Sequence, residues 1–152
     1  MTVTIEILNQ QTALAVPEDK IRAVLRHVML QELGHEVNLS VAVVNDRRIA
    51  ELNKAFLDHL GPTDVLAFPL GEEESSEESM AVFGEIVISA DRALEEARER
   101  KIDPQIELIL YAVHGMLHLT GYGDDTSARR REMRRREAEV LGSLSGKGGK
   151  KR

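Results

Sequence analysis

Residues 103–121 read DPQIELILYAVHGMLHLTG, and the rest of the chain is best understood around them. Asp103 followed by Pro104 is typical of a helix start, because aspartate caps the first turn and proline fits the first helical position. Gly121 is typical of a helix end. The stretch therefore predicts a long, largely apolar helix from residue 104 to about residue 119.

Outward from this helix, strand-like and helix-like segments follow one another in the order β-α-β-α-β-β-α-α-α. Apolar residues at helical spacing define the helix after Pro17, and a second helix is expected to turn Ile49, Leu52 and Phe56 inward. Since strands gather early and helices late, we expect an α+β fold, a small mixed β-sheet with about five helices. The expected strands are 1–8, 39–44, 65–68 and 83–88, and the later helices are 45–60, 89–101, 104–119 and 126–141.

Length and composition favour one domain. The 152 residues are 42% hydrophobic and include no cysteine, so a metal site would have to use His, Asp or Glu. We expect a single metallohydrolase domain over residues 1–141, a mobile loop at 71–79 and a disordered basic Gly/Ser/Lys tail over 142–152. Neither a signal peptide nor a membrane span is apparent, which favours a cytoplasmic protein.

The net charge of −6 conceals an uneven distribution. Residues 126–152 hold ten Lys or Arg and three Asp or Glu, a balance of +7, whereas the first 125 residues carry −13. Nucleic-acid-binding proteins usually have a basic face, and the C-terminal end is the candidate for one here. Aromatic residues are only 3% of the chain, however, so composition alone does not indicate RNA binding.

Three residues of the segment 114–125 form a candidate metal site. His114 and His118 are four positions apart on the predicted helix, which places their Cβ atoms about 5–6 Å apart on one face. The turn at Gly121 can bring Asp124 back toward them. Three protein ligands with an open fourth position are typical of a catalytic metal centre, here at the end of a helix and in the turn after it.

Two other interpretations of the histidine pair are available. Histidines at this spacing can simply be hydrogen-bonded residues of the core or the surface. They also match the two ends of the H-E-x-x-H metalloprotease motif, but the catalytic glutamate of that motif is replaced by Gly115. A peptidase would therefore need its general base from elsewhere.

The segment 114–122 resembles the HGxLHLxGY signature of the YbeY family of endoribonucleases. Three further stretches agree in order and spacing: Leu52-Asn53 with PTDVLAFP at 62–69, GEIVIS at 84–89, and Met133, Glu137 and Leu141 in the last helix. The resemblance covers about residues 39–141. It implies a zinc-dependent, single-strand-specific endoribonuclease that matures the 3′ end of 16S rRNA, acts in ribosome quality control and works with the ribosome or its small subunit.

The chain departs from the family pattern at two positions. The third metal ligand of the family is histidine, and the matching residue here is Asp124, whose oxygen suits zinc but also admits Mn²⁺ or Fe²⁺ more readily. The family arginine that follows the LN motif corresponds to Leu57, and His59 is a candidate replacement. If nothing replaces that arginine, charge on the phosphate would be stabilised by the metal alone.

Further polar residues are candidates for supporting roles. Asp125 could act as a base or as a partner of the metal site, and Arg130, Arg131 and Arg134 could contact RNA. The arginines of the last helix could equally form a solvated face paired with Glu132, Glu137 and Glu139. Asn53 could bond within the core or face the cleft, and Thr63-Asp64 could serve in a turn or in catalysis.

Two alternatives to the endoribonuclease stay open at this point. One is a ribosome-associated assembly factor with a structural metal and little or no catalysis, which the departure at Leu57 supports. The other is a metal-dependent hydrolase of a small substrate, which leaves the basic C-terminal end without a role. The sequence does not decide the oligomeric state.

Overall fold

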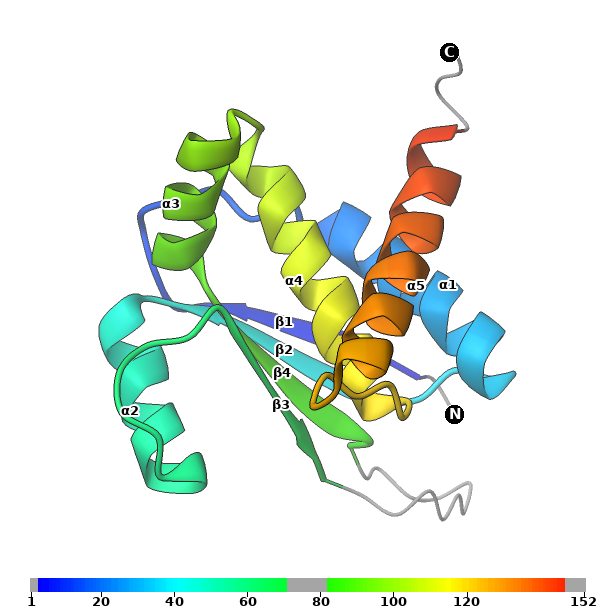
Figure 1. Ribbon diagram of the computed structural model, residues 1–152, viewed down its shortest axis with the longest axis horizontal. Helices are drawn as coiled ribbons and strands as arrows, with labels where there is room; N and C mark the ends of the chain where they lie inside the picture. The colour runs from blue at the N-terminus through cyan, green and yellow to red at the C-terminus, as the bar shows by residue number, and fades with distance from the viewer. Residues whose placement is uncertain (1–2, 71–81, 147–152) are drawn as a thin grey trace.

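The computed structural model describes residues 3–70 and 82–146, and its elements follow the predicted order (Figure 1). The strands are β1 (Ile5–Asn9), β2 (Leu39–Val44), β3 (Val65–Pro69) and β4 (Gly84–Ser89). The helices are α1 (Glu18–Leu33), α2 (Asp46–Leu57), α3 (Ala90–Arg100), α4 (Pro104–Leu119) and α5 (Ser127–Gly146). This confirms the predicted α+β fold with a small mixed sheet and five helices.

The four strands form one sheet in the order β1-β2-β4-β3. β1, β2 and β4 are parallel, with Ile7 opposite Val41 and Val43 opposite Ile88. β3 is antiparallel to β4 and closes one edge of the sheet. The parallel strands require crossover connections, and α1 supplies the one between β1 and β2.

Alternate side chains of the strands enter two separate apolar clusters, as expected when neighbouring residues point to opposite faces. The larger cluster includes Val41, Val43 and Ile86 together with residues of α1, α4 and α5. The smaller one joins Val44 and Val87 to Ile49 of α2. Figure 1 shows α2 apart from the other helices, on the opposite side of the sheet from α4 and α5.

α4 lies at the centre of the molecule and contacts α1, α3, α5, β3 and β4. Nine of its 16 residues are buried. It begins as predicted, because the Asp103 side chain accepts a hydrogen bond from the backbone N–H of Gln105 at 2.9 Å. Its last turns are consequently held in place from several sides, which fixes the residues that the helix carries.

The expectation that Phe56 faces inward is wrong. Its side chain is 67% exposed, and its ring meets Phe68 edge-on with the ring centroids 5.6 Å apart. The helical spacing placed Phe56 on the same face as Ile49, but Phe68 belongs to β3, the edge strand. Phe56 therefore rests at the margin of the sheet, where the smaller cluster offers it little cover.

α2 is also shorter than predicted, and its end is followed by a loop that Asn53 holds in place. Asp58 takes a left-handed conformation (φ 57°) that terminates the helix after Leu57, ahead of the Gly61-Pro62 pair. Asn53 is buried and its amide donates to the carbonyl of Gly61 at 3.0 Å. The side chain therefore ties the helix to the loop before β3. Of the two roles considered for Asn53, a hydrogen bond within the core is the one that the structure shows.

The C-terminal helix is longer than predicted. α5 continues to Gly146, so residues 142–146 are helical where a disordered tail was expected. Val140 is fully buried and Leu141 packs against the core, and extending an anchored helix costs much less than starting one. The remainder of the expected tail (147–152) and the expected loop at 71–79 lie outside the described residues.

Candidate metal centre

The end of α4 and the turn after it bring together the three predicted metal ligands. The rings of His114 and His118 meet edge-on, with centroids 4.7 Å apart and planes at 78°. An oxygen of Asp124 lies 3.2 Å from Nε2 of His118. The three residues each offer one ligand atom, and all three atoms lie within 4.8 Å of one another.

Gly121 makes this convergence possible. Its φ of +114° is a conformation that other residues rarely adopt, and it lets the chain reverse directly after the helix. The backbone N–H of Tyr122 then bonds to the carbonyl of Leu117 at 3.0 Å, which fixes the turn. Asp124 is thereby returned to the helix end, while Thr126 caps the start of α5 through the N–H of Arg129.

The donor set fits a divalent transition metal. Two imidazole nitrogens and one carboxylate oxygen are ligands that zinc accepts, and three protein ligands leave a coordination position open. The side chains of His114 and His118 are about one quarter exposed and that of Asp124 is half exposed, so the centre is accessible from outside. Among residues 3–70 and 82–146, no other group of histidine and acidic side chains has this spacing.

The second ring nitrogen of His114 has a partner from α5. Nδ1 of His114 is hydrogen-bonded to a carboxylate oxygen of Glu137, and the two side chains are 26% and 13% exposed. Burial alone would lower the pKa of His114, but the hydrogen bond and the negative charge of Glu137 outweigh it and raise that pKa above its usual range. Asp64 and Asp124 act in the same direction.

A cavity of about 160 Å³ lies on the Glu137 side of His114. Acidic groups dominate its lining, with Arg100 as the one cation among the residues that line it. Asp64 belongs to this lining and also fixes the start of β3 by accepting the N–H of Val65 at 2.9 Å. Asp64 thus serves a turn and, through its charge, acts on His114. The lining residues are Asp64, Glu96, Arg100, Glu107, Leu110, Tyr111, His114 and Glu137.

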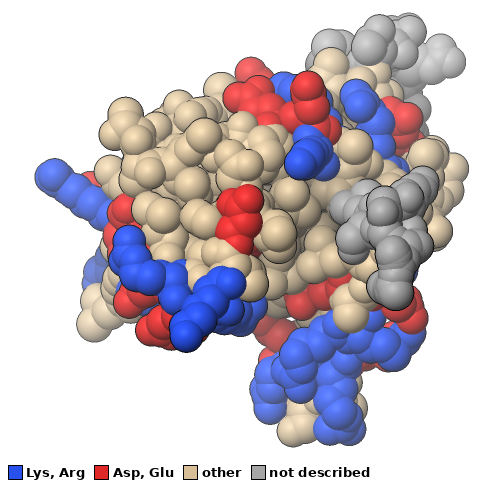
Figure 2. Space-filling model, turned by 90° about the horizontal axis from the view of Figure 1, so that it is seen from above, with Lys and Arg blue, Asp and Glu red and all other residues tan. Residues whose placement is uncertain are grey.

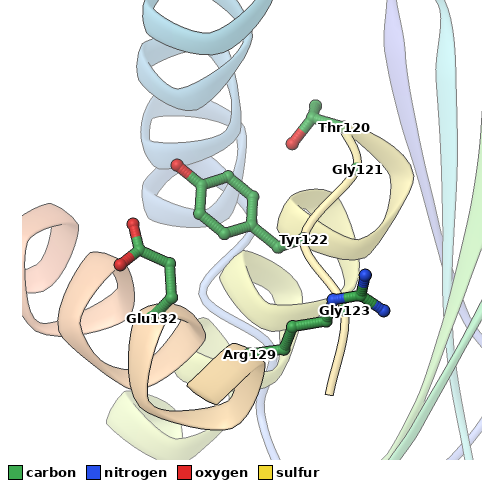
Figure 3. A pocket seen from close by; sticks show the side chains of 6 residues that line it. All are labelled: Thr120, Gly121, Tyr122, Gly123, Arg129 and Glu132. Carbon is green, nitrogen blue, oxygen red and sulfur yellow. The ribbon is translucent and has the colours of Figure 1, made fainter. Parts of the chain in front are cut away.

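A surface hollow of about 270 Å³ lies beside the turn that leads to Asp124 (Figure 3). Tyr122 and Glu132 reach toward one side of it, and Arg129 lies against the backbone at Gly123. The hydroxyl of Tyr122 is 3.2 Å from a carboxylate oxygen of Glu32 in α1. The hollow is lined by Thr120, Gly121, Tyr122, Gly123, Arg129 and Glu132.

Two of the sequence candidates lie outside the ligand cluster. Asp125 is exposed and pairs with Arg129, its Oδ1 lying 2.9 Å from Nη1 of the arginine. That hydrogen bond lowers the pKa of Asp125, which makes it a weaker proton acceptor than a free carboxylate. His59 is exposed in the loop after α2, and neither residue belongs to the group with metal-ligand spacing.

The arginines of α5 divide into paired and unpaired side chains. Arg135 pairs with Glu132 and Glu139, and Arg136 is held by Glu32 of α1 at 2.7 Å. Within the described part of the chain, Arg131 and Arg134 form no ion pair or side-chain hydrogen bond. Arg130 donates to the backbone carbonyl of Asp124 at 3.1 Å, which places its guanidinium beside the candidate ligands.

These side chains give the molecule a basic projection. In Figure 2 the Lys and Arg side chains gather, with a few acidic ones among them, on the lobe at the lower right, where α5 lies when Figure 1 is viewed from above. The expected pairing of arginines with Glu132 and Glu139 is confirmed. Pairing with Glu137 is wrong, because that carboxylate turns inward to His114.

Glu137 is the residue beside the candidate ligands whose position the sequence does not predict. The pattern of the last helix includes it and predicts an ion pair with neighbouring arginines, not a contact with His114. One signal was available: Met133, Glu137 and Val140 have helical spacing, and the two apolar members are buried. A carboxylate on a buried stripe needs a hydrogen-bond partner, and a histidine on the helix packed against it can serve.

Comparisons with known proteins show the family to which the chain is similar. The model of the family described as Endoribonuclease YbeY matches residues 6–145. An endoribonuclease YbeY of Micrococcus luteus is 39% identical over 146 residues, covering 91% of this chain and 92% of that protein. Another, from Thermoanaerobacter pseudethanolicus, is 36% identical over 140 residues, covering 84% and 87%.

A solved structure shares the fold. The solution structure of a Thermotoga maritima protein superposes with a TM-score of 0.62 at 30% identity, covering 95% of this chain and 93% of that one. The family match over residues 6–145 includes β2, β3 and β4 in full, all but the first residue of β1 and all but the last residue of α5. Across the described residues, no helix combines the length and apolar character needed to cross a membrane.

Proposed function

This chain belongs to the YbeY endoribonuclease family, whose members act in rRNA maturation, and we propose that it cleaves single-stranded RNA at a metal ion held by His114, His118 and Asp124. The observation that carries the proposal is the convergence of three ligand atoms, from one helix end and its turn, within 4.8 Å. Family membership makes the chain an RNA-cleaving hydrolase. The metal and its ligands are the part that we propose.

Zinc is the first candidate for the ion, with Mn²⁺ and Fe²⁺ as alternatives. Two imidazoles favour zinc, while the carboxylate of Asp124 is a harder ligand that admits the other two. When bound, such an ion supplies Lewis acidity toward a phosphate and toward the water that attacks it. The protein's own contribution is to hold the three donors at the end of a rigid helix and to leave one side open to solvent.

The side chains around the centre supply positive charge for the RNA backbone. Arg130 donates through Nη1 to the carbonyl of Asp124 and through Nη2 to the hydroxyl of Ser127. A guanidinium has five N–H donors, so most of them stay available for a phosphate. We assign Arg131 and Arg134 to phosphates further along the strand, since neither is engaged by an acidic group of the described chain. Binding of the RNA backbone along these three arginines would account for the basic character of α5 in an otherwise acidic chain.

The proposed substrate is the 3′-end region of 16S rRNA, reached on the ribosome or its small subunit in the cytoplasm, with a further part in ribosome quality control. The family supports the choice of rRNA. The basic helix supports docking to RNA, because neutralised phosphates release counterions and so favour binding.

One observation supports a second candidate function, that of a ribosome-associated assembly factor. Leu57 takes the place of the family arginine and is the last residue of α2. Figure 1 shows α2 on the opposite side of the sheet from α4. His59 lies in the following loop and outside the ligand cluster. A ribosome-associated assembly factor, with a structural metal and little or no catalysis, would need neither residue.

The deciding experiment compares cleavage of a labelled single-stranded RNA by wild type and His118→Ala, purified side by side so that the variant controls for contaminating ribonuclease. We expect cleavage by wild type alone, lost with a chelator and restored by a divalent ion. Equal cleavage by both proteins, or none by either with several metals, would favour the assembly factor. Cleavage of small phosphodiesters that RNA competitors do not inhibit would indicate a small-substrate hydrolase.

A further inference from the structure

The contact between Glu137 and His114 joins two helices at the metal centre. The residues are 23 positions apart, on α5 and α4, and the carboxylate meets Nδ1 of the ring. Nδ1 is therefore occupied by a protein group, and Nε2 is the nitrogen of His114 that is left to face a metal.

The position of Glu137 within α5 is fixed by its neighbours. Met133 is 2% exposed and Val140 is fully buried, and Glu137 lies between them on the same stripe of the helix. Arg136 anchors the same turn to α1 through Glu32, at 2.7 Å. The carboxylate is thus held against His114 by the packing of α5 and has little freedom to turn toward solvent.

The chemistry of the two groups determines which of them donates the hydrogen bond and which accepts it. A carboxylate only accepts hydrogen bonds, and a neutral imidazole has one N–H and one lone pair. Glu137 as acceptor therefore selects the form of His114 that carries its proton on Nδ1. The lone pair is then on Nε2, where a metal can use it, and the carboxylate increases the basicity of that nitrogen.

We propose that Glu137 is a positioning residue, which orients His114 and fixes its tautomer so that Nε2 is presented to the metal. The inference rests on the proposed function, because it takes His114 to be a ligand. Partners of this kind commonly change metal affinity by about 10- to 100-fold. The prediction for this chain is that Glu137 sets how tightly the centre holds its ion without touching the ion.

The first test measures zinc affinity by competition with a coloured chelator for wild type, Glu137→Ala, Glu137→Gln, His118→Ala and Glu139→Ala. Glu139 is the matched control, since it is on the same helix, is exposed and pairs with Arg135 and Arg136. We expect a loss of about 10- to 100-fold for Glu137→Ala and a smaller loss for Glu137→Gln, which keeps an acceptor oxygen. Glu139→Ala should match wild type. Thermal unfolding monitored by circular dichroism identifies any variant that fails to fold.

The second test reads the tautomer directly in the metal-free protein. Long-range ¹H–¹⁵N NMR spectra distinguish which ring nitrogen carries the proton. Neutral His114 should hold it on Nδ1 in wild type and in Glu139→Ala, and should become a mixture in Glu137→Ala. Folded Glu137 variants with wild-type zinc affinity and an unchanged tautomer would overturn the inference. If wild type binds no more metal than His118→Ala, the proposed metal centre itself fails.

Discussion

The packing of α4 against the sheet leaves no room for a Cβ atom at Gly115, which lies next to the candidate ligand His114. A Cβ at this position would lie 2.7 Å from Cγ2 of Ile86 and 3.3 Å from a methyl carbon of Val65. The residue after the first histidine therefore faces β4 and β3 and has no room for a side chain. The glutamate that a metalloprotease would carry there is excluded by packing, which supports the separation from that class on structural grounds.

We expect Gly115→Ala to lower the free energy of unfolding. Alanine improves helix propensity by about 1 kcal/mol, but overpacking against β-branched side chains costs about 1–3 kcal/mol. Gly142→Ala in α5 is the control, because no described atom lies within 4 Å of its added Cβ, and it should be neutral or stabilising. Urea unfolding of the two variants checks this, and equal stability would show that the sheet yields at residue 115.

We expect Asp124 to set the metal preference of the proposed centre. Its carboxylate offsets one unit of the ion's charge and is a harder ligand than imidazole. We expect Asp124→His to raise the preference for zinc over Mn²⁺, measured by competition between the two ions. Asp125→His, one position further on and paired with Arg129, serves as the control. An unchanged preference in Asp124→His would mean that the carboxylate does not set the selectivity.

At the scale of elements, α5 carries the surface that we assign to RNA. Substituting Arg131 and Arg134 together with alanine should weaken RNA binding and reduce its salt dependence, because each lost phosphate contact lowers the slope of log K against log salt by about 0.7 for single strands. Arg135→Ala is the matched control, since that guanidinium is already engaged by Glu132 and Glu139. Filter binding over a range of salt measures both slopes. Equal slopes in all three proteins would show that Arg131 and Arg134 do not contact RNA phosphates.

The elements also show what the sequence can and cannot predict. His114, His118 and Asp124 lie within one helix and its turn, so local spacing was enough to predict that they converge. Glu137 comes from another helix, and its inward direction depends on how α5 packs against α4, which no local pattern specifies. The prediction that Phe56 faces inward was wrong for the same reason, since helical spacing indicates the face of the helix but not how far the sheet extends beneath that face.

At the scale of the whole molecule, Glu107 links stability to pH. It is 1% exposed, and burial raises the pKa of its carboxyl above the ordinary 4.5 despite the opposing charge of Arg100. One of its oxygens has no hydrogen-bond partner among the described groups. Because the folded state keeps the proton longer than the unfolded chain, the stability that Glu107 contributes is greatest below about pH 4.5 and falls as pH rises through the raised pKa.

Glu107→Gln should remove this dependence. The variant should therefore gain stability relative to wild type between acidic and neutral pH, since an amide does not ionise. Urea unfolding of both proteins from pH 4 to pH 8 measures the difference between their free energies of unfolding. Contributions of other titrating groups largely cancel in this difference. A stability difference that stays constant over this range would contradict the prediction.

The order of the elements along the chain has a consequence for the newly made protein. A polypeptide emerges from its N-terminus onward, so the sheet is complete once Ser89 has appeared, and the three proposed ligands follow by residue 124. Glu137 arrives only with the middle of α5. A product cut short within that helix would keep the three proposed ligands and lack the carboxylate that we infer orients the first of them, so the proposed centre becomes fully ordered only once α5 has been made.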